Sequence, residues 1–132
     1  MRLRFLGEVA RAFVGLARIE LLLRRRDLPT VCRRLGIAWD LESAAPPATE
    51  PAVLPGRART ALRACSAATK RWPAGDTCLR RCLVVGHRLR ALSPVLRIGV
   101  RRDADGFLAH SWLEIDGRTL DPTSADFATL GR

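Results

Sequence analysis

A hairpin signal near the carboxyl end limits the folds open to this chain more than any other feature. Phe107 to Ile115 has the composition of a strand, Asp116-Gly117 is a strong two-residue turn signal, and Arg118 to Pro122 reads as the returning strand. A turn of this length places Ile115 opposite Arg118, and that pairing sets the register of both strands. The sequence therefore predicts an antiparallel pair whose two faces can be assigned residue by residue.

Strand alternation brings chemically useful side chains onto one face of this hairpin. His110 and Asp121 are diagonal neighbours whose backbones lie roughly 7–8 Å apart, so a hydrogen bond between the carboxylate and the imidazole is within reach. A shift of the register by one residue would separate them. The face with the histidine carries His110, Trp112, Thr119 and Asp121, and the opposite face carries Ala109, Ser111, Leu113 and Ile115, a set suited to packing.

A cysteine stands where a helix is expected to begin. Asp76 and Thr77 are favoured N-cap residues, and a long run with helical apolar periodicity follows them. Cys78 would then face the positive end of the helix dipole, which favours the thiolate, the nucleophilic form of the side chain. Because Cys78 lies 32 positions before His110, only the tertiary structure can bring the two together.

Three blocks of sequence carry a resemblance to a known family. They are Cys78-Leu79-x-Arg81, then Leu96 to Val100, then Phe107 to Glu114 followed by Gly117. In order, spacing and flanking residues they resemble the lasso-peptide leader peptidases, the B-two type of lasso peptide biosynthesis protein within the transglutaminase-like cysteine protease superfamily. The likeness covers roughly residues 55 to 122. The chain departs from the family at Cys82, where serine is usual, and at Ser111, where alanine is usual.

The resemblance implies a fold and a reaction. The implied fold is α+β, with N-terminal helices and a papain/transglutaminase-like core in which the nucleophile helix packs on a small antiparallel sheet. The implied reaction is removal of the leader from a ribosomally synthesised lasso-peptide precursor by a cysteine peptidase, with catalytic Cys78, His110 and Asp121 and no cofactor. The implied partners are the leader region of the precursor, a separate precursor-recognition protein of the B-one type and the lasso cyclase.

Other interpretations fit some of the same residues. A transglutaminase-type acyl transfer would use the same three side chains with an amine in place of water, and a basic adaptor that binds anionic partners without chemistry would need none of them. Trp112 could bind substrate as a wall of the site, shield the imidazole or belong to the core. A metal site at Cys78, Cys82 and His87 is disfavoured, because His87 lies about 180° from Cys78 on an ideal helix.

The chain divides at a proline-rich segment. Residues 2–26 and 30–35 read as helices with apolar stripes, and Gly36 ends the second. Four prolines among alanines mark residues 42–56 as a linker. We expect an N-terminal helical segment at 1–41, this linker at 42–56 and a peptidase core at 57–132, with a third helix at 57–72, a strand at 95–101 and at most a short helix at 124–130.

Composition restricts the partners and the compartment. A length of 132 residues suits one domain, and a net charge of +10 favours anionic partners. Aromatic residues make up only 5% of the chain and tyrosine does not occur, so a base-stacking platform for nucleic acid is not expected. The apolar run Ala12 to Ala17 is far shorter than the roughly 20 residues that span a bilayer. We expect a cytoplasmic protein with free cysteines.

The N-terminal helix has three interpretations. Residues 1–40 carry nine arginines against four acidic residues, and Leu6, Val9 and Phe13 form part of an apolar stripe. This stripe could pack on the core, dock a protein that carries an anionic leader, or lie on a membrane surface. Forty residues are too few for a recognition module with its own sheet, so the resemblance implies that this module is a separate protein.

Overall fold

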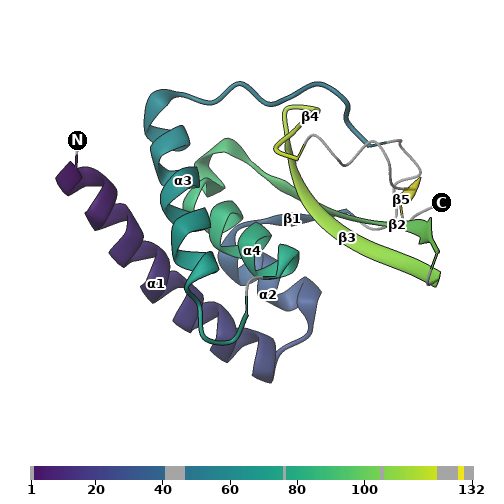
Figure 1. The fold of residues 1–132 in the computed structure, drawn as a ribbon, viewed down its shortest axis with the longest axis horizontal. Helices are drawn as coiled ribbons and strands as arrows, with labels where there is room; N and C mark the ends of the chain where they lie inside the picture. The colour runs from purple at the N-terminus through teal and green to yellow at the C-terminus, as the bar shows by residue number, and fades with distance from the viewer. Residues whose placement is uncertain (1, 41–46, 76, 105, 122–127, 130–132) are drawn as a thin grey trace.

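The computed structural model describes residues 2–40, 47–75, 77–104, 106–121 and 128–129, and α4 lies between a small sheet and α1 (Figure 1). The helices are α1 (Arg2–Arg25), α2 (Leu28–Leu35), α3 (Gly56–Lys70) and α4 (Cys78–Arg88), with a 3₁₀ turn at Arg90–Leu92. The strands are β1 (Ala38–Trp39), β2 (Val95–Asp103), β3 (Gly106–Ile115), β4 (Arg118–Thr119) and β5 (Ala128–Thr129).

The sheet has the order β1-β2-β3-β4, with β5 paired to β2. The predicted α+β class with a transglutaminase-like core is confirmed. The sheet is mixed rather than antiparallel, because β1 runs parallel to β2 and the chain reaches β2 only after α3 and α4. The prediction of a short helix at 124–130 is wrong at Ala128–Thr129, because these residues form strand β5. Residues 124–127 and 130 lie outside the described part of the chain.

Helix α2 begins and ends at local signals. The Asp27 side chain accepts a hydrogen bond from the Thr30 backbone N–H at 3.2 Å, and Gly36 ends the helix in the left-handed region at φ 79°. The helix begins at Leu28, two residues before the start that we predicted at Thr30. Pro29 fits the first turn of α2, where a backbone nitrogen needs no partner, so the helix begins before Thr30.

The hairpin turn has the predicted form. Asp116 and Gly117 have φ values of 52° and 71°, as a type I′ turn requires. Ile115 pairs with Arg118, so the predicted register is confirmed. Strand β4 stops at Thr119 and is shorter than the predicted strand from Arg118 to Pro122, of which Pro122 lies outside the described residues.

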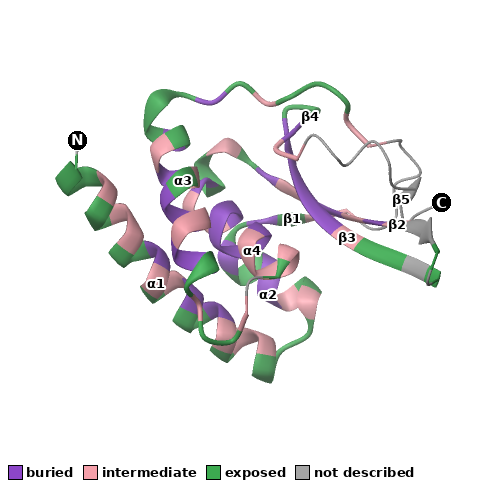
Figure 2. Ribbon diagram, in the orientation of Figure 1, coloured by how far each residue is buried: buried purple, intermediate pink, exposed green. Residues whose placement is uncertain are grey.

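One hydrophobic core joins the parts of the chain on both sides of the proline-rich segment (Figure 2). Buried side chains come from all four helices, from β2 and β3, and from Leu54 within that segment. Ala52 donates its backbone N–H to the Thr119 carbonyl at 2.8 Å, which ties the segment to the end of the sheet. The division into 1–41, 42–56 and 57–132 stays a prediction, and described residues of all three parts take part in this core or line its edge.

Helix α1 turns part of its apolar stripe toward the core. Ala12, Leu16 and Ile19 are buried, and Val9 and Phe13 pack against the core cluster. The inward side of α3 is rich in alanine, which lets α1 lie close along it (Figure 1). Of the three interpretations of the stripe, packing on the core therefore describes Val9 and Phe13 and docking does not, because a helix with several apolar faces buries the one that fits its neighbours.

Candidate active site

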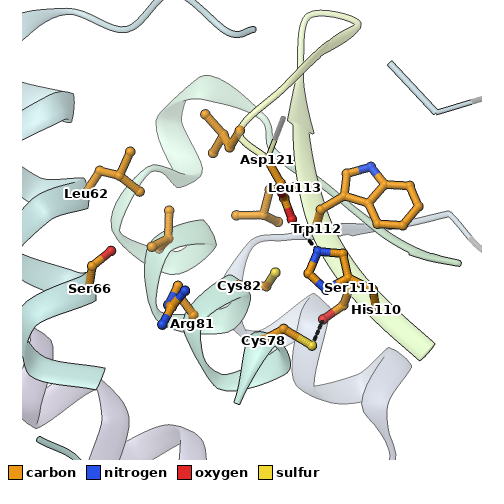
Figure 3. A pocket seen from close by; sticks show the side chains of 12 residues that line it. Leu62, Ser66, Cys78, Arg81, Cys82, His110, Ser111, Trp112, Leu113 and Asp121 are labelled. Carbon is orange, nitrogen blue, oxygen red and sulfur yellow. Dashed lines mark hydrogen bonds and ion pairs between the residues drawn. The ribbon is translucent and has the colours of Figure 1, made fainter. Parts of the chain in front are cut away.

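A pocket opens between α3, α4 and the β3–β4 hairpin (Figure 3). The residues predicted to be catalytic, Cys78, His110 and Asp121, all line it. Three segments that are far apart in the sequence thus supply one cavity. The other lining residues are Leu62 and Ser66 from α3, Arg81, Cys82 and Val85 from α4, and Ser111, Trp112, Leu113 and Leu120 from the hairpin.

Cys78 is the first residue of α4 and is half-buried. Thr77 caps the helix, since its hydroxyl accepts a hydrogen bond from the Arg80 backbone N–H at 3.2 Å, and the predicted helix start is confirmed. The thiol therefore lies at the positive end of the helix dipole. Ser111 donates a hydrogen bond from Oγ to Cys78 Sγ over 3.3 Å (Figure 3). Both features stabilise negative charge on the sulfur.

Ser111 is a residue of the site that the sequence analysis missed. Strand alternation assigned it to the packing face of the hairpin together with Leu113, and that face does pack on α4. Because Cys78 begins α4, a polar side chain on this face reaches the thiol. The signal that could have found it is a lone hydroxyl among apolar residues on a face predicted to be core.

His110 and Asp121 form the hydrogen bond that the hairpin register predicted, between His110 Nε2 and Asp121 Oδ2 (Figure 3). Their side chains are 22% and 26% exposed, so the pair is accessible from the pocket. The Thr119 hydroxyl accepts from the Asp121 backbone N–H at 2.9 Å and donates to the Asp121 carbonyl at 2.8 Å. This local turn fixes the aspartate just beyond the end of β4.

Trp112 and Glu114 form a buried layer behind the histidine. Trp112 is 1% exposed, and its ring stacks on the His110 ring with centroids 6.1 Å apart. The indole N–H donates to Glu114 Oε2 at 2.9 Å, and Arg97 donates to Glu114 Oε1 at 3.3 Å. Glu114 also accepts from the Ala48 backbone N–H at 3.0 Å. Trp112 is thus a core side chain that also lines the pocket.

The other three cysteines are buried and hold their protons tightly. Burial raises the pKa of Cys32 to about 11 and the pKa of Cys65 and of Cys82 to about 12. At Cys82, one turn after Cys78, burial outweighs the effect of the nearby Ser111 hydroxyl, which acts in the opposite direction on the pKa. Among the four thiols, Cys78 is the one that is not fully buried, so the environment distinguishes it.

Arg81 and His87 lie on different sides of α4. Arg81 is half-buried and lines the pocket, because the pocket side of α4 includes its first turn. His87 Nδ1 lies 3.0 Å from the Leu35 carbonyl oxygen and borders a groove between α1 and α4. In the described parts of the chain, no three His, Cys, Asp or Glu side chains gather as metal ligands would.

The fold and the pocket together define the class of protein. A helix that begins with a cysteine and packs on a sheet that carries a histidine forms a papain/transglutaminase-like core. The family model named Transglutaminase-like superfamily matches residues 15–131, so the chain belongs to this superfamily, which includes cysteine peptidases. No curated protein and no solved structure matches the chain. Within the described ranges, every helix is too short or too polar to cross a bilayer.

Proposed function

We propose that this chain is a cysteine peptidase that removes the leader from a ribosomally synthesised lasso-peptide precursor. The observation that carries the proposal is that Cys78 lines the same pocket as the hydrogen-bonded pair of His110 and Asp121. Membership of a superfamily that includes cysteine peptidases supports the reaction class. The three sequence blocks around these residues support the lasso-peptide substrate.

In the proposed reaction, the Cys78 thiolate attacks the last carbonyl carbon of the leader, and a carbon–sulfur bond forms as the peptide C–N bond breaks. His110, which has taken the thiol proton, donates it to the departing amine of the core peptide. His110 then accepts a proton from a water molecule whose oxygen attacks the thioester. The products are the leader as a carboxylic acid and the regenerated thiol.

Neighbouring groups assist each step of this mechanism. Asp121 bonds Nε2 of His110, so Nδ1 would exchange the proton with the sulfur, and the carboxylate would stabilise the imidazolium. Ser111 would stabilise the thiolate through its hydroxyl. Trp112 would keep the imidazole ring in place and serve as a wall for the substrate. The Cys78 backbone N–H at the helix start is the candidate donor to the oxyanion.

The proposal includes partners. A separate precursor-recognition protein of the B-one type would bind the leader and deliver it to this chain, and the lasso cyclase would take the released core peptide. The net charge of +10 suits an anionic leader. We place these steps in the cytoplasm, where thiols stay reduced.

Incubation of a candidate precursor with the purified chain and the recognition protein, followed by mass spectrometry, tests this proposal. We expect separate leader and core fragments from the native chain and none from Cys78→Ser with an unchanged circular-dichroism spectrum. Cys82→Ser is the matched control, because it makes the same change one turn away, and it should retain cleavage. An intact precursor with the native chain would contradict the proposed function. A leader fragment that gains the mass of an added amine would indicate transglutaminase-type transfer instead.

Labelling of the thiols separates an enzyme from a non-catalytic adaptor. Iodoacetamide at neutral pH should modify Cys78 first, because burial raises the pKa of Cys32 to about 11 and that of Cys65 and Cys82 to about 12. Peptide mapping of the labelled protein over time gives the four rates. Equal rates at all four sites would remove the physical reason for naming Cys78 as the nucleophile.

A further inference from the structure

The side of α1 that points away from the core is exposed (Figure 2), and a row of apolar residues runs along it, where a surface helix is ordinarily polar. The members of this row are exposed and follow one another at alternating intervals of four and three positions. We call the row, whose six residues are given at the end of this paragraph, the outer seam. Leu3, Val14 and Leu21 within it are 85%, 72% and 55% exposed. Alternating intervals of four and three are those with which one helix packs along another. The outer seam consists of Leu3, Gly7, Ala10, Val14, Ala17 and Leu21.

A row of arginines borders the outer seam along one edge. The row repeats every seven residues, so its members lie above one another on the helix surface. Arg90, which is exposed, lines the same groove as Val14 and adds another positive charge there. A partner that packs on the outer seam would therefore meet positive charge along its flank. The exposed members of the row are Arg4, Arg11, Arg18 and Arg25.

The two carboxylates of α1 pair mainly with α4 and not with this arginine row. Glu8 accepts hydrogen bonds of 2.7 and 2.6 Å from Arg88, and its nearest approach to the row is 3.6 Å, to Arg11. Glu20 pairs with Arg80 at the start of α4. Their side chains are 13% and 14% exposed, so both serve contacts toward α4.

We propose that the outer seam is a docking surface for an amphipathic helix of a partner protein, one that carries acidic residues beside its own apolar row. The partner's apolar side chains would pack between those of the outer seam, and Gly7, Ala10 and Ala17 would allow its backbone to approach closely. Its carboxylates would pair with the arginine row. A second copy of this chain fits less well, because it would add another strongly basic surface. The proposal does not depend on the reaction in the pocket.

An anionic membrane is the competing occupant, and the composition of the outer seam argues against it. Half of the seam residues are glycine or alanine, and none is aromatic. A helix that lies on a membrane buries a wide face with Trp, Phe and Leu side chains. A narrow row in which glycine and alanine separate Leu3, Val14 and Leu21 suits a second helix better.

Direct binding of a synthetic helical peptide tests the proposal. The probe repeats leucine along a heptad row and glutamate beside it, and fluorescence anisotropy measures its affinity for the full chain. We expect saturable binding that weakens as salt rises. Val14→Gln should weaken it about tenfold, the equivalent of one exposed apolar contact, and the double substitution of Arg4 and Arg18 by Gln should weaken it as well.

Matched controls make this test specific. Val53→Gln changes a valine that is 84% exposed and lies outside α1. The double substitution of Arg34 and Arg59 by Gln removes two positive charges, as the Arg4 and Arg18 variant does, but from α2 and α3. Both control variants should bind the peptide as the native chain does. Equal weakening by Val14→Gln and Val53→Gln, or no binding of the peptide, would overturn the proposal. Binding only to phosphatidylserine vesicles would assign the outer seam to a membrane, and a dimer that Val14→Gln dissociates would assign it to a second copy. Because no outcome depends on cleavage, the test is independent of the proposed function.

Discussion

Helix α4 is held from two sides, and the contacts on these sides differ in kind. On the α1 side, Glu20 pairs with Arg80 near the start of α4, and Glu8 pairs with Arg88 at its end. On the pocket side, the half-exposed Cys78 meets the serine hydroxyl of the hairpin. Ion pairs thus fix the position of the helix on one side, whereas on the other side its first residue hydrogen-bonds within the pocket. Substitutions on the two sides should therefore separate stability from activity.

The largest expected effect is on the pocket side, at Asp121. Asp121→Asn should lower the rate of precursor cleavage by about 10²–10⁴, because the imidazole loses the carboxylate that orients it and stabilises its charged form. Glu114→Gln should lower the rate much less, because Glu114 lies four residues from His110 and bonds Trp112 and Arg97 instead. Mass spectrometry of the products gives both rates. The reverse ranking would mean that Glu114 orients the histidine.

The packing of α4 can be tested without touching either set of polar contacts. A methyl group at Gly86 would lie 2.7 Å from Ile37 Cδ1 and 2.9 Å from Cγ1, so Gly86→Ala should lower the free energy of unfolding by about 1–3 kcal/mol. Gly7→Ala is the control, because a methyl group there meets nothing within 4 Å and should stabilise α1 by about 0.5–1 kcal/mol. Urea titrations measure both. A loss of stability in Gly7→Ala equal to that in Gly86→Ala would contradict the close approach of α4 and Ile37.

A smaller effect is expected from the hydroxyl that contacts the thiol. Ser111→Ala should slow the alkylation of Cys78 at neutral pH about fivefold, because it removes the hydrogen bond from Ser111 to the sulfur. A factor of five corresponds to a net hydrogen-bond contribution of about 1 kcal/mol. Ser66→Ala serves as the control, since Ser66 lines the same pocket from α3, and it should leave the rate unchanged. The pH dependence of iodoacetamide labelling gives the comparison. If both variants label at the native rate, the serine contributes only packing.

The smallest expected effect is on the α1 side, at acid pH. The hydrogen bond from Arg80 holds the pKa of Glu20 below its usual value of 4.5, against the opposing effect of burial. Folding therefore favours the ionised carboxylate, and its contribution is complete above about pH 4.5 and is lost as the pH falls through the folded-state value. Glu20→Gln should cost up to about 1 kcal/mol at neutral pH and flatten the loss of stability in acid. Glu50→Gln, at a carboxylate that is 72% exposed, should change neither; thermal unfolding from pH 7 to 3 measures both.

Local signals in the sequence determined the parts of the fold in which the interacting residues are close along the chain. Asp116-Gly117 fixed the turn, because both positions tolerate positive φ, and the turn fixed the register. Thr77 fixed the start of α4 through one hydrogen bond to a residue three positions later. The contact between His110 and Asp121 follows from that same register.

The tertiary structure alone decided which surfaces meet. Burial of apolar area has no direction, so the periodicity of α1 could not show that Val9 and Phe13 face the core while Val14 faces solvent. Nor could strand alternation show that the packing face of β3 would bring Ser111 to Cys78, a residue 33 positions away. Each of these outcomes depends on how distant elements fit against one another, and their shapes are set only when the whole core is packed.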